Sequence, residues 1–228
     1  MSSHAVPAFR PPQQARSRMS LRKVLDAAEQ VLATGGLAEF TVATVADRAG
    51  VSVGAIYRRF AGKEQLLHAV KDELLGRLET GVAEALRGAE SGADGVLAAF
   101  AHALAGTFAG HDRVFPELLG GQRADAVERG LRTLATVQDA LADALAPYRR
   151  EIRRAEPDRA IRVAARTIAG SCVHRAATCR SWPDGLTWPG WADEVAAMAG
   201  AYLGTPGGYA FRGAGSSSRS GDDQRESR

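Results

Sequence analysis

The amino-acid sequence predicts an all-α protein, with an N-terminal three-helix unit followed by a larger helical C-terminal half. Three observations favour this fold class. The chain is rich in Ala, Leu, Arg and Gly, and aromatic residues make up only 6% of it. Its apolar residues recur at the three- and four-residue spacing of helices, and glycine and proline clusters separate the segments. No segment has the pattern of a confident strand, and no internal repeat is present.

Residues 1–15 are predicted to form a disordered arm, because their prolines prevent an early helix. Basic side chains on and just after this arm suit two roles. They would lie across a DNA backbone or in a minor groove, or they would belong to a flexible solubilising tail. These side chains are Arg10, Arg16 and Arg18.

The first helix is expected over about 20–34. Ser20 is a suitable N-cap, and Gly35 and Gly36 are expected to end the helix. The apolar residues that would form its buried face are Leu21, Leu25, Ala28 and Leu32.

Two short helices joined by a tight turn are expected over about 41–60. Thr41 is a good N-cap for the first of them, and Gly50 suits the left-handed position that ends it. Ser52 would then cap a second helix, Val53 to Phe60. This layout is typical of a helix-turn-helix.

The second short helix has one anchoring face and one outward face. Ile56 and Phe60, four residues apart, are expected to point into the core. Small outward residues let a helix approach another surface closely, and Tyr57 and two arginines can reach phosphates or base edges. Taken alone, the tyrosine would as often be a packed aromatic, and the two arginines would usually form a solvated face. The outward set is Val53, Gly54, Ala55, Tyr57, Arg58 and Arg59.

Lys63 stands at the start of the next expected helix, where the helix dipole disfavours a cation. Its position is more easily explained if an anion binds there. The stretch 41–66 resembles the DNA-binding signature of the TetR family of bacterial transcription regulators. One departure is Gly62, where the family usually has a polar capping residue. The matching residues are Thr41, Val45, Ala46, Ala49, Gly50, Val51, Ser52, Gly54, Tyr57, Phe60, Lys63, Glu64 and Leu66.

The resemblance implies a partner, a double-stranded DNA operator. The charge distribution favours the same partner, because residues 1–63 hold nine Lys and Arg against four Asp and Glu, in a chain whose net charge is only +3. The predicted DNA-binding residues are Thr41, Ser52, Val53, Gly54, Ala55, Tyr57, Arg58, Arg59 and Lys63.

Domain boundaries follow from the breaks in the pattern. Residues 16–63 are predicted to be the DNA-binding domain, 64–204 a helical effector-binding and dimerisation domain, and 205–228 a Gly/Ser-rich disordered tail. Within the larger domain, Pro147 is expected to kink or restart a helix and Asp158 to cap one. The helices expected there are Lys63 to about Leu86, 95–109, 116–119, a long one from about 123, 158–180 and 190–203, with a linker at 88–95.

The family resemblance implies a homodimer that forms through the last two long helices, about 158–180 and 190–203. Two recognition helices related by a dyad can contact half-sites in successive major grooves. Small residues on the first of these helices would allow close approach across the dyad, although tight packing within one subunit would use the same residues. They are Ala164, Ala165, Ala169, Gly170 and Ala176.

The resemblance also implies a small-molecule effector of unknown identity. The predicted pocket consists of Phe100, Leu104, Phe108, Phe115 and His174, with Leu119, His102 and His111 as further candidates. The alternative is that the aromatic residues simply fill the core. The expected function is a repressor that the effector releases from a palindromic operator, and the alternative is a ligand-independent dimeric regulator or an activator.

No enzyme activity, cofactor or metal site is predicted. Cys172 and His174 are two residues apart and would point to different sides of a helix, so they cannot act as a nucleophile and its base. Cys172 and Cys179 would lie too far apart along one helix for a disulfide. With no apolar run long enough to cross a membrane, we expect a cytoplasmic protein with reduced thiols.

Overall fold

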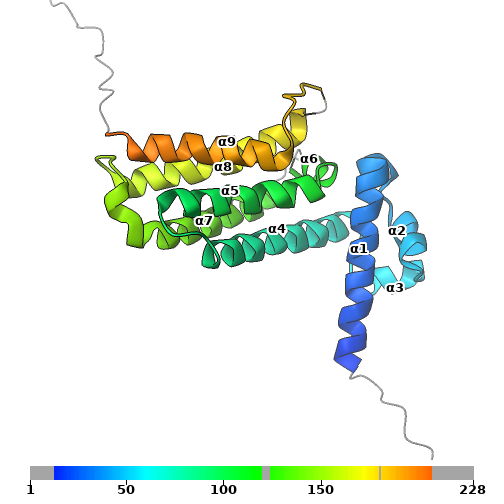
Figure 1. Cartoon of the computed structure of the whole chain (residues 1–228). Coiled ribbons are helices and arrows are strands. Elements are labelled where there is room, and N and C mark those ends of the chain that lie inside the picture. Colours follow the sequence, from blue (N-terminus) through cyan, green and yellow to red (C-terminus); the bar gives the residue numbers. More distant parts are fainter. Residues whose placement is uncertain (1–12, 120–123, 180, 207–228) are drawn as a thin grey trace, which may run out of the picture.

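The computed structural model describes residues 13–119, 124–179 and 181–206, and their regular structure is helical (Figure 1). No strand occurs in these residues, which confirms the predicted fold class. The helices are α1 (Gln13–Glu39), α2 (Val42–Ala49), α3 (Val53–Tyr57), α4 (Lys63–Arg87), α5 (Ala93–Gly110), α6 (Val114–Leu119), α7 (Ala124–Leu145), the 3₁₀-helix η1 (Ala146–Glu151), α8 (Pro157–Thr178) and α9 (Trp188–Gly204). Most of the predicted arm and tail lies outside the described residues.

α1 is longer than the sequence predicted. It begins at Gln13, so Ser20 lies inside the helix and is not its N-cap. The extension is physically reasonable because the Gln, Ala, Arg and Met residues before Ser20 are good helix formers. The predicted break at the other end is present, since Gly36 has a φ of 61° and interrupts the helix before its last residues.

The helix-turn-helix forms as predicted in its caps and its turn. The Thr41 hydroxyl accepts a hydrogen bond from the Thr44 backbone N–H at 3.0 Å, and the Ser52 hydroxyl accepts one from Ala55 at 3.2 Å. Gly50 has the left-handed conformation, with a φ of 63°. α3 ends at Tyr57, three residues earlier than expected, yet Phe60 is still buried.

Several helix starts in the C-terminal half differ from expectation, among them α6, which begins at Val114 and not at residue 116. Asp158 is not an N-cap, because Pro157 takes the first helical position and the Asp158 carboxylate instead accepts a hydrogen bond from Arg149 at 2.8 Å. α5 starts at Ala93, whose N–H donates to the Glu151 carboxylate at 2.9 Å. α9 starts at Trp188, after the capping residue Thr187.

α4 joins the two parts of the molecule. With its 25 residues it is about 37 Å long, and its buried residues run from Leu66, near α1, to Val82, deep in the C-terminal half. We call α1–α3 with the first turns of α4 the N-terminal unit, and the remainder of α4 with α5–α9 the body. The buried apolar residues of both form one continuous cluster.

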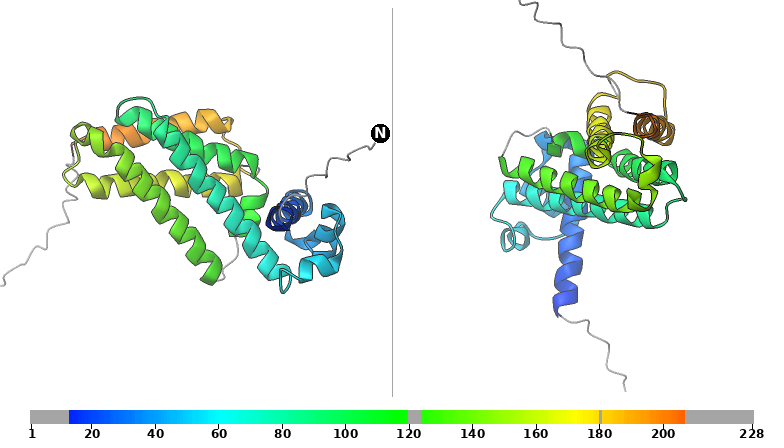
Figure 2. Two further views of the ribbon diagram at one scale, coloured as in Figure 1. Left: turned by 90° about the horizontal axis from the view of Figure 1, so that it is seen from below. Right: turned by 90° about the vertical axis from the view of Figure 1, so that its left-hand side faces the viewer.

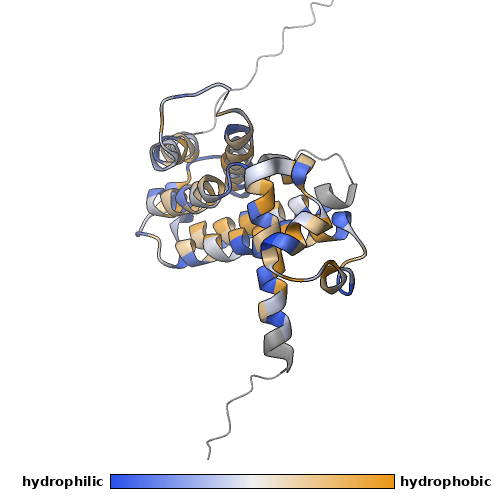
Figure 3. Ribbon diagram, turned by 90° about the vertical axis from the view of Figure 1, so that its right-hand side faces the viewer, coloured by the Kyte–Doolittle hydropathy of each residue, from blue (hydrophilic) through white to orange (hydrophobic). Residues whose placement is uncertain are grey.

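The helices of the body run alongside one another, and α1 crosses α4 near its N-terminal end (Figures 1 and 2). α8 and α9 lie on one side of the body and α4 on the opposite side. The side of the molecule that carries α1–α3 shows hydrophobic and hydrophilic residues on the same helices, as amphipathic helices do (Figure 3). Within the described residues, no helix has the length and apolar character needed to cross a membrane.

Candidate nucleic-acid interface and ligand cavity

The outward face of α3 is open and carries an exposed aromatic side chain. Tyr57 is 54% exposed and Val53 is 41% exposed. Gly54 between them has no atom within 4 Å of the position that a Cβ would take. Ile56, which is 1% exposed, and the buried Phe60 fix the helix from below. α3 therefore presents a small-residue surface with a tyrosine on it.

The basic side chains around α3 differ in their partners. Arg58 is exposed, and the Arg59 guanidinium donates a hydrogen bond to the Ser17 hydroxyl of α1 at 3.0 Å. The Lys63 ammonium donates to the Leu37 carbonyl at 3.0 Å, so the chain itself supplies an acceptor and the position of Lys63 does not require a bound anion. An ammonium carries three N–H donors, so this one bond does not exhaust it.

Thr41 lies at the start of α2, and Ser52 and Ala55 lie at the start of α3. Thr41 and Ser52 are exposed, and both hydroxyls serve as helix caps. Ala55 is partly buried. All nine residues predicted for DNA contact thus lie on α3, at its ends, or at the starts of α2 and α4.

A cavity of about 350 Å³ lies in the body between α4, α5, α7 and α8. Most of its walls are apolar, and the charged side chains among its lining residues are basic. Its lining consists of Lys71, Leu75, Leu78, Leu104, Phe108, Phe115, Gly130, Leu131, Thr133, Leu134, Val137, Arg166, Ala169, Gly170 and Val173. The exposed members of this set lie on α7 and α8, so the cavity opens between these two helices.

Three of the five residues predicted for the pocket line this cavity: Leu104, Phe108 and Phe115. Phe100 does not, because it is fully buried in the core. His174 does not either; it lies on an exposed position of α8, so it is not a core histidine. Of the other candidates, His102 bonds to Asp193 at 2.7 Å.

Sequence reasoning missed the cavity walls from α4, α7 and α8. Helical spacing does not separate core residues from cavity residues, because both recur at the same intervals. The two basic lining residues also differ in exposure. Lys71 is only 6% exposed and its ammonium lies 3.4 Å from the Leu118 carbonyl, whereas Arg166 is exposed.

A polar network holds α4 against α7 beside the cavity. The Glu79 carboxylate accepts hydrogen bonds from Arg129 and from the lining residue Thr133, both at 2.7 Å. Arg129 also pairs with Asp72 at 3.2 Å. Burial raises the pKa of Glu79, but the hydrogen bonds from Arg129 and Thr133 outweigh it, so this pKa lies below its ordinary value. Glu79 is therefore ionised at neutral pH and fixes the register of the two helices.

A second polar cluster connects α1 to the body. The Glu29 carboxylate pairs with His111 Nε2 at 2.8 Å and also with Arg77 of α4. His111 Nδ1 faces the Thr107 carbonyl at 2.8 Å, so both ring nitrogens face acceptors, an arrangement that favours the doubly protonated ring. The hydrogen bond to Glu29 raises the pKa of His111 against the effect of burial.

The same cluster lowers the pKa of Glu29. Burial raises this pKa, and the hydrogen bonds from His111 and Arg77 more than reverse the effect. The His111 ring also packs edge-on against Phe115 of the cavity, with 6.0 Å between ring centroids. The cluster therefore lies between the cavity wall and the first helix of the N-terminal unit.

The small residues expected at a dimer contact are used within the subunit. Ala164, Ala165 and Ala176 of α8 are buried, while Ala169 and Gly170 line the cavity. The outer surface of α8 and α9 instead exposes larger apolar side chains, among them Val163 and Met198. Cys172 is buried, which raises the pKa of its thiol to about 12, and neither Cys172 nor Cys179 forms a disulfide.

A larger hollow of about 870 Å³ lies at the far end of the body, between α5, η1 and α9. Its lining includes charged residues of both signs, among them Asp94, Arg153 and Asp193. It is remote from the N-terminal unit and has no wall from α4. We therefore regard the smaller apolar cavity as the better candidate for a ligand site. In the described part of the chain, no group of three or more His, Cys, Asp or Glu residues is placed to hold a metal ion.

Comparisons with known proteins agree with this geometry. The sequence model for bacterial regulatory proteins of the tetR family matches residues 24–70, from α1 into α4. No curated protein sequence matches the chain. Similar solved structures include the transcriptional regulator FadR from Bacillus subtilis in complex with stearoyl-CoA, with a TM-score of 0.66 and 21% identity over 80% of this chain and 98% of that one.

Two further solved structures have the same fold. The fatty acid degradation regulator FadR from Bacillus halodurans has a TM-score of 0.62 and 18% identity, over 84% of this chain and 96% of its own. The TetR family transcriptional regulator PfmR from Thermus thermophilus has a TM-score of 0.58 and 18% identity, over 82% of this chain and 97% of its own. At such low sequence identity, these similarities show a shared fold only.

Proposed function

We propose that this chain, which belongs to the TetR family of bacterial regulatory proteins, is a sequence-specific DNA-binding transcriptional regulator whose operator affinity a small-molecule effector controls. The observation that carries this proposal is the joining of two sites by one helix. α4 begins at Lys63 beside the recognition helix and continues into a wall of the apolar cavity.

α3 is the proposed recognition helix. Its open surface of Val53, Gly54 and Tyr57 fits into a major groove, where small residues permit close approach to base edges. Arg58 and Lys63 flank this surface and would bind phosphates on either side. The Ser52 hydroxyl caps α3 directly after the turn, and the Thr41 hydroxyl caps α2, the helix that precedes the turn.

A homodimer through α8 and α9 is the proposed DNA-binding species. A five-residue recognition helix contacts few base pairs by itself, and two of them related by a dyad can bind a palindromic site. The exposed side chains Val163 of α8 and Met198 of α9 support this surface as the dimer contact, since the alternative is to leave them in water.

The proposed effector is a long-chain acyl compound with an anionic head group, such as an acyl-CoA. The cavity volume of about 350 Å³ suits an apolar chain better than a whole coenzyme. The head group would then lie at the opening between α7 and α8, where Arg166 is exposed. The stearoyl-CoA in the B. subtilis FadR structure and the fatty acid role named for the B. halodurans protein support this class of ligand.

Effector control would act through two conformations of the dimer. An effector shifts such an equilibrium only by its difference in affinity for the two states. A chain inserted beside Lys71, Thr133 and Phe115 would disturb the α4–α7 network and the Glu29–His111 cluster, and both bear on the position of α1 and α4. The DNA-binding units would then no longer match the operator, so the protein would act as a repressor that the effector releases.

Selection of binding sites from random duplex DNA, combined with the stoichiometry of the complex, tests the DNA-binding part of the proposal. We expect an enriched inverted repeat that binds an even number of subunits. Arg58→Ala and Lys63→Ala should weaken binding, and each should reduce the slope of log affinity against log salt by about 1 for every phosphate that is no longer neutralised. Arg132→Ala, an exposed position on α7, is the control and should leave affinity unchanged. Selection that yields no enriched sequence would refute sequence-specific binding.

A further inference from the structure

The first turns of α1 extend beyond the rest of the N-terminal unit. α1 begins at Gln13, and its free end projects past α2 and α3 (Figures 1 and 2). We call residues 13–23 the α1 spur. The core-facing side of α1 begins with the partly buried Leu21, so a helix that only completed the three-helix core would not need the turns before it.

The spur is strongly basic. Between residues 13 and 23 the chain has four basic side chains and no acidic one. Arg18, Arg22 and Lys23 are exposed, and within the described residues none of the three forms an ion pair. Met19 is exposed as well. Asp26 and Glu73 line the same hollow as Arg18 and Arg22, but in this described part of the chain no ion pair joins them. Positive charge that is not tied up in ion pairs along one helix suits a polyanion.

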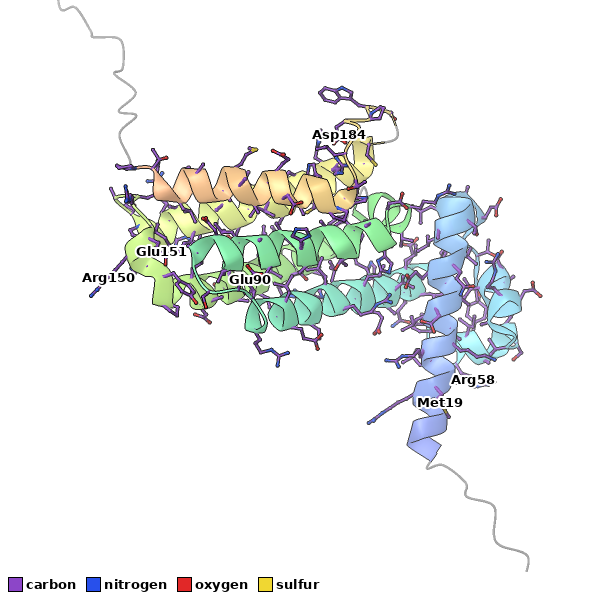
Figure 4. The ribbon with its side chains drawn as sticks, viewed as in Figure 1. Met19, Arg58, Glu90, Arg150, Glu151 and Asp184 are labelled. Atoms are coloured by element: carbon purple, nitrogen blue, oxygen red, sulfur yellow. The ribbon has the colours of Figure 1, made fainter. Side chains whose placement is uncertain are left out.

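The spur is attached directly to the proposed recognition helix. The Ser17 hydroxyl accepts a hydrogen bond from Arg59, which follows α3, at a distance of 3.0 Å. Arg58 lies on the same side of the molecule as the free end of α1 (Figure 4). A guanidinium has five N–H donors, so Arg59 can hold Ser17 and still bind a phosphate. The basic surface of the spur is therefore continuous with the proposed DNA interface.

The direction of the spur decides where on the DNA it would lie. Its free end points away from the side of the body that carries α8 and α9 (Figures 1 and 2). In a dimer formed through α8 and α9, the two spurs would point outward, away from the dyad. Each would follow the duplex past the outer end of its half-site.

From these observations we infer that the α1 spur is a second DNA-binding element, which contacts backbone phosphates outside the half-site that α3 binds. This inference rests on the proposed DNA-binding function. Arg18 and Arg22 are one helical turn apart and are the principal contacts. Phosphate contacts carry no sequence information, so the spur adds affinity and a longer footprint without adding base specificity.

The test uses the full chain and the operator duplex recovered by selection, in one version with flanking base pairs and one trimmed to the two half-sites. The variant is Arg18→Ala with Arg22→Ala. The matched control removes two exposed arginines of the body, Arg87→Ala with Arg132→Ala, and so makes the same change in net charge. Equal circular dichroism spectra and unfolding midpoints establish that both variants are folded.

A dimer of the spur variant would neutralise up to four fewer phosphates, so the slope of log affinity against log salt should fall by roughly 2 to 4. Wild type should bind the flanked duplex more tightly than the trimmed one, and the spur variant should bind both alike. The control should behave as wild type. Arg18→Lys with Arg22→Lys should restore most of the slope, because lysine also neutralises phosphate.

An unchanged slope and an undiminished preference for flanked DNA in the Arg18→Ala, Arg22→Ala variant would overturn this inference. The proposed function would survive that result if Lys63→Ala still weakened operator binding. If wild type itself showed no specific binding, the proposed function would fail first. The two failures are therefore distinguishable in one set of titrations.

Discussion

The N-terminal unit and the body are built from the same kind of helix but use their apolar residues differently. In the N-terminal unit Phe40, Val45 and Ile56 are packed out of contact with water, and the exposed face of α3 carries small and polar residues. In the body Phe108 and Phe115 stack on each other, with 4.3 Å between ring centroids, and border a cavity of about 350 Å³. A filled core holds a recognition surface rigid, whereas an incompletely filled one leaves space for a ligand.

The largest effect should come from a pair of phenylalanines on one helix. Phe100→Ala should lower the free energy of unfolding by about 3 to 5 kcal/mol, because Phe100 is surrounded on all sides. Phe108→Ala, two turns further along α5, should cost less, since its ring already borders a void and has fewer neighbours to lose. Urea unfolding of both variants measures the difference. An equal loss of stability in the two variants would contradict the difference in packing between Phe100 and Phe108.

Filling the cavity should separate ligand binding from DNA binding. An added Cβ at Gly170 meets no atom within 4 Å, and Gly170 lines the cavity, so Gly170→Leu introduces an apolar side chain at the opening. We expect stearoyl-CoA affinity to fall tenfold or more, about 1.4 kcal/mol, with operator affinity unchanged. Gly106→Leu is the control, because Gly106 is equally open but exposed on α5 and away from the cavity. Calorimetric titration decides the matter. Normal binding by Gly170→Leu would exclude this cavity.

Helix caps provide a smaller and more local comparison. Thr41→Ala removes the cap of α2, and Thr187→Ala removes the equivalent cap of α9. Each should cost about 1 kcal/mol of stability. Only Thr41→Ala should also weaken operator binding, because α2 belongs to the helix-turn-helix and α9 does not. Thermal unfolding and gel-shift titration give the two quantities. A comparable loss of DNA affinity in Thr187→Ala would contradict the assignment.

The smallest expected effect concerns pH and the Glu29–His111 cluster. The pKa of His111 is raised, so the stability it contributes is complete below its ordinary pKa of 6.5 and is lost as the pH rises through the folded-state value. The pKa of Glu29 is lowered, so its contribution is present above 4.5 and is lost as the pH falls through the folded value. The cluster should therefore stabilise most between about pH 4.5 and 6.5.

A matched pair of variants tests this window. The stability difference between wild type and His111→Gln should be largest near pH 6 and should shrink toward pH 9. His102→Gln removes a histidine whose carboxylate partner is exposed, and should cost little at any pH. Urea unfolding at several pH values gives both curves. A stability difference between wild type and His111→Gln that grows with pH would contradict stabilisation by a protonated His111 paired with Glu29.

The N-terminal unit could be predicted from the sequence in detail because its signals are local. Thr41, Gly50 and Ser52 define a turn through the bonds and backbone angles that their own types favour. The predicted start of α1 was wrong because the signal used was local. A serine suits an N-cap, but here helix-forming residues precede Ser20 and the helix continues through it. Asp158 misled in the same way, since Pro157 already fixed where α8 begins.

The cavity could not be predicted to the same degree because it depends on distances between helices. Phe100 and Phe108 are eight residues apart on one face of α5, and both share the same periodicity. The packing of α7 and α8 decides that one is enclosed and the other borders the cavity. On α8, His174 is exposed while Cys172, two residues earlier, is buried, and the spacing alone does not tell which side faces the cavity.

The most direct test of effector-controlled DNA binding is the operator affinity of the wild-type dimer with and without saturating stearoyl-CoA. If the cavity and the DNA interface are coupled as proposed, the affinity should fall by roughly 5- to 150-fold, the usual range for coupling between two sites. The reverse titration should show the same factor for stearoyl-CoA when operator DNA is bound. Bound stearoyl-CoA with unchanged operator affinity would contradict the coupling, and absence of stearoyl-CoA binding would contradict the proposed class of effector.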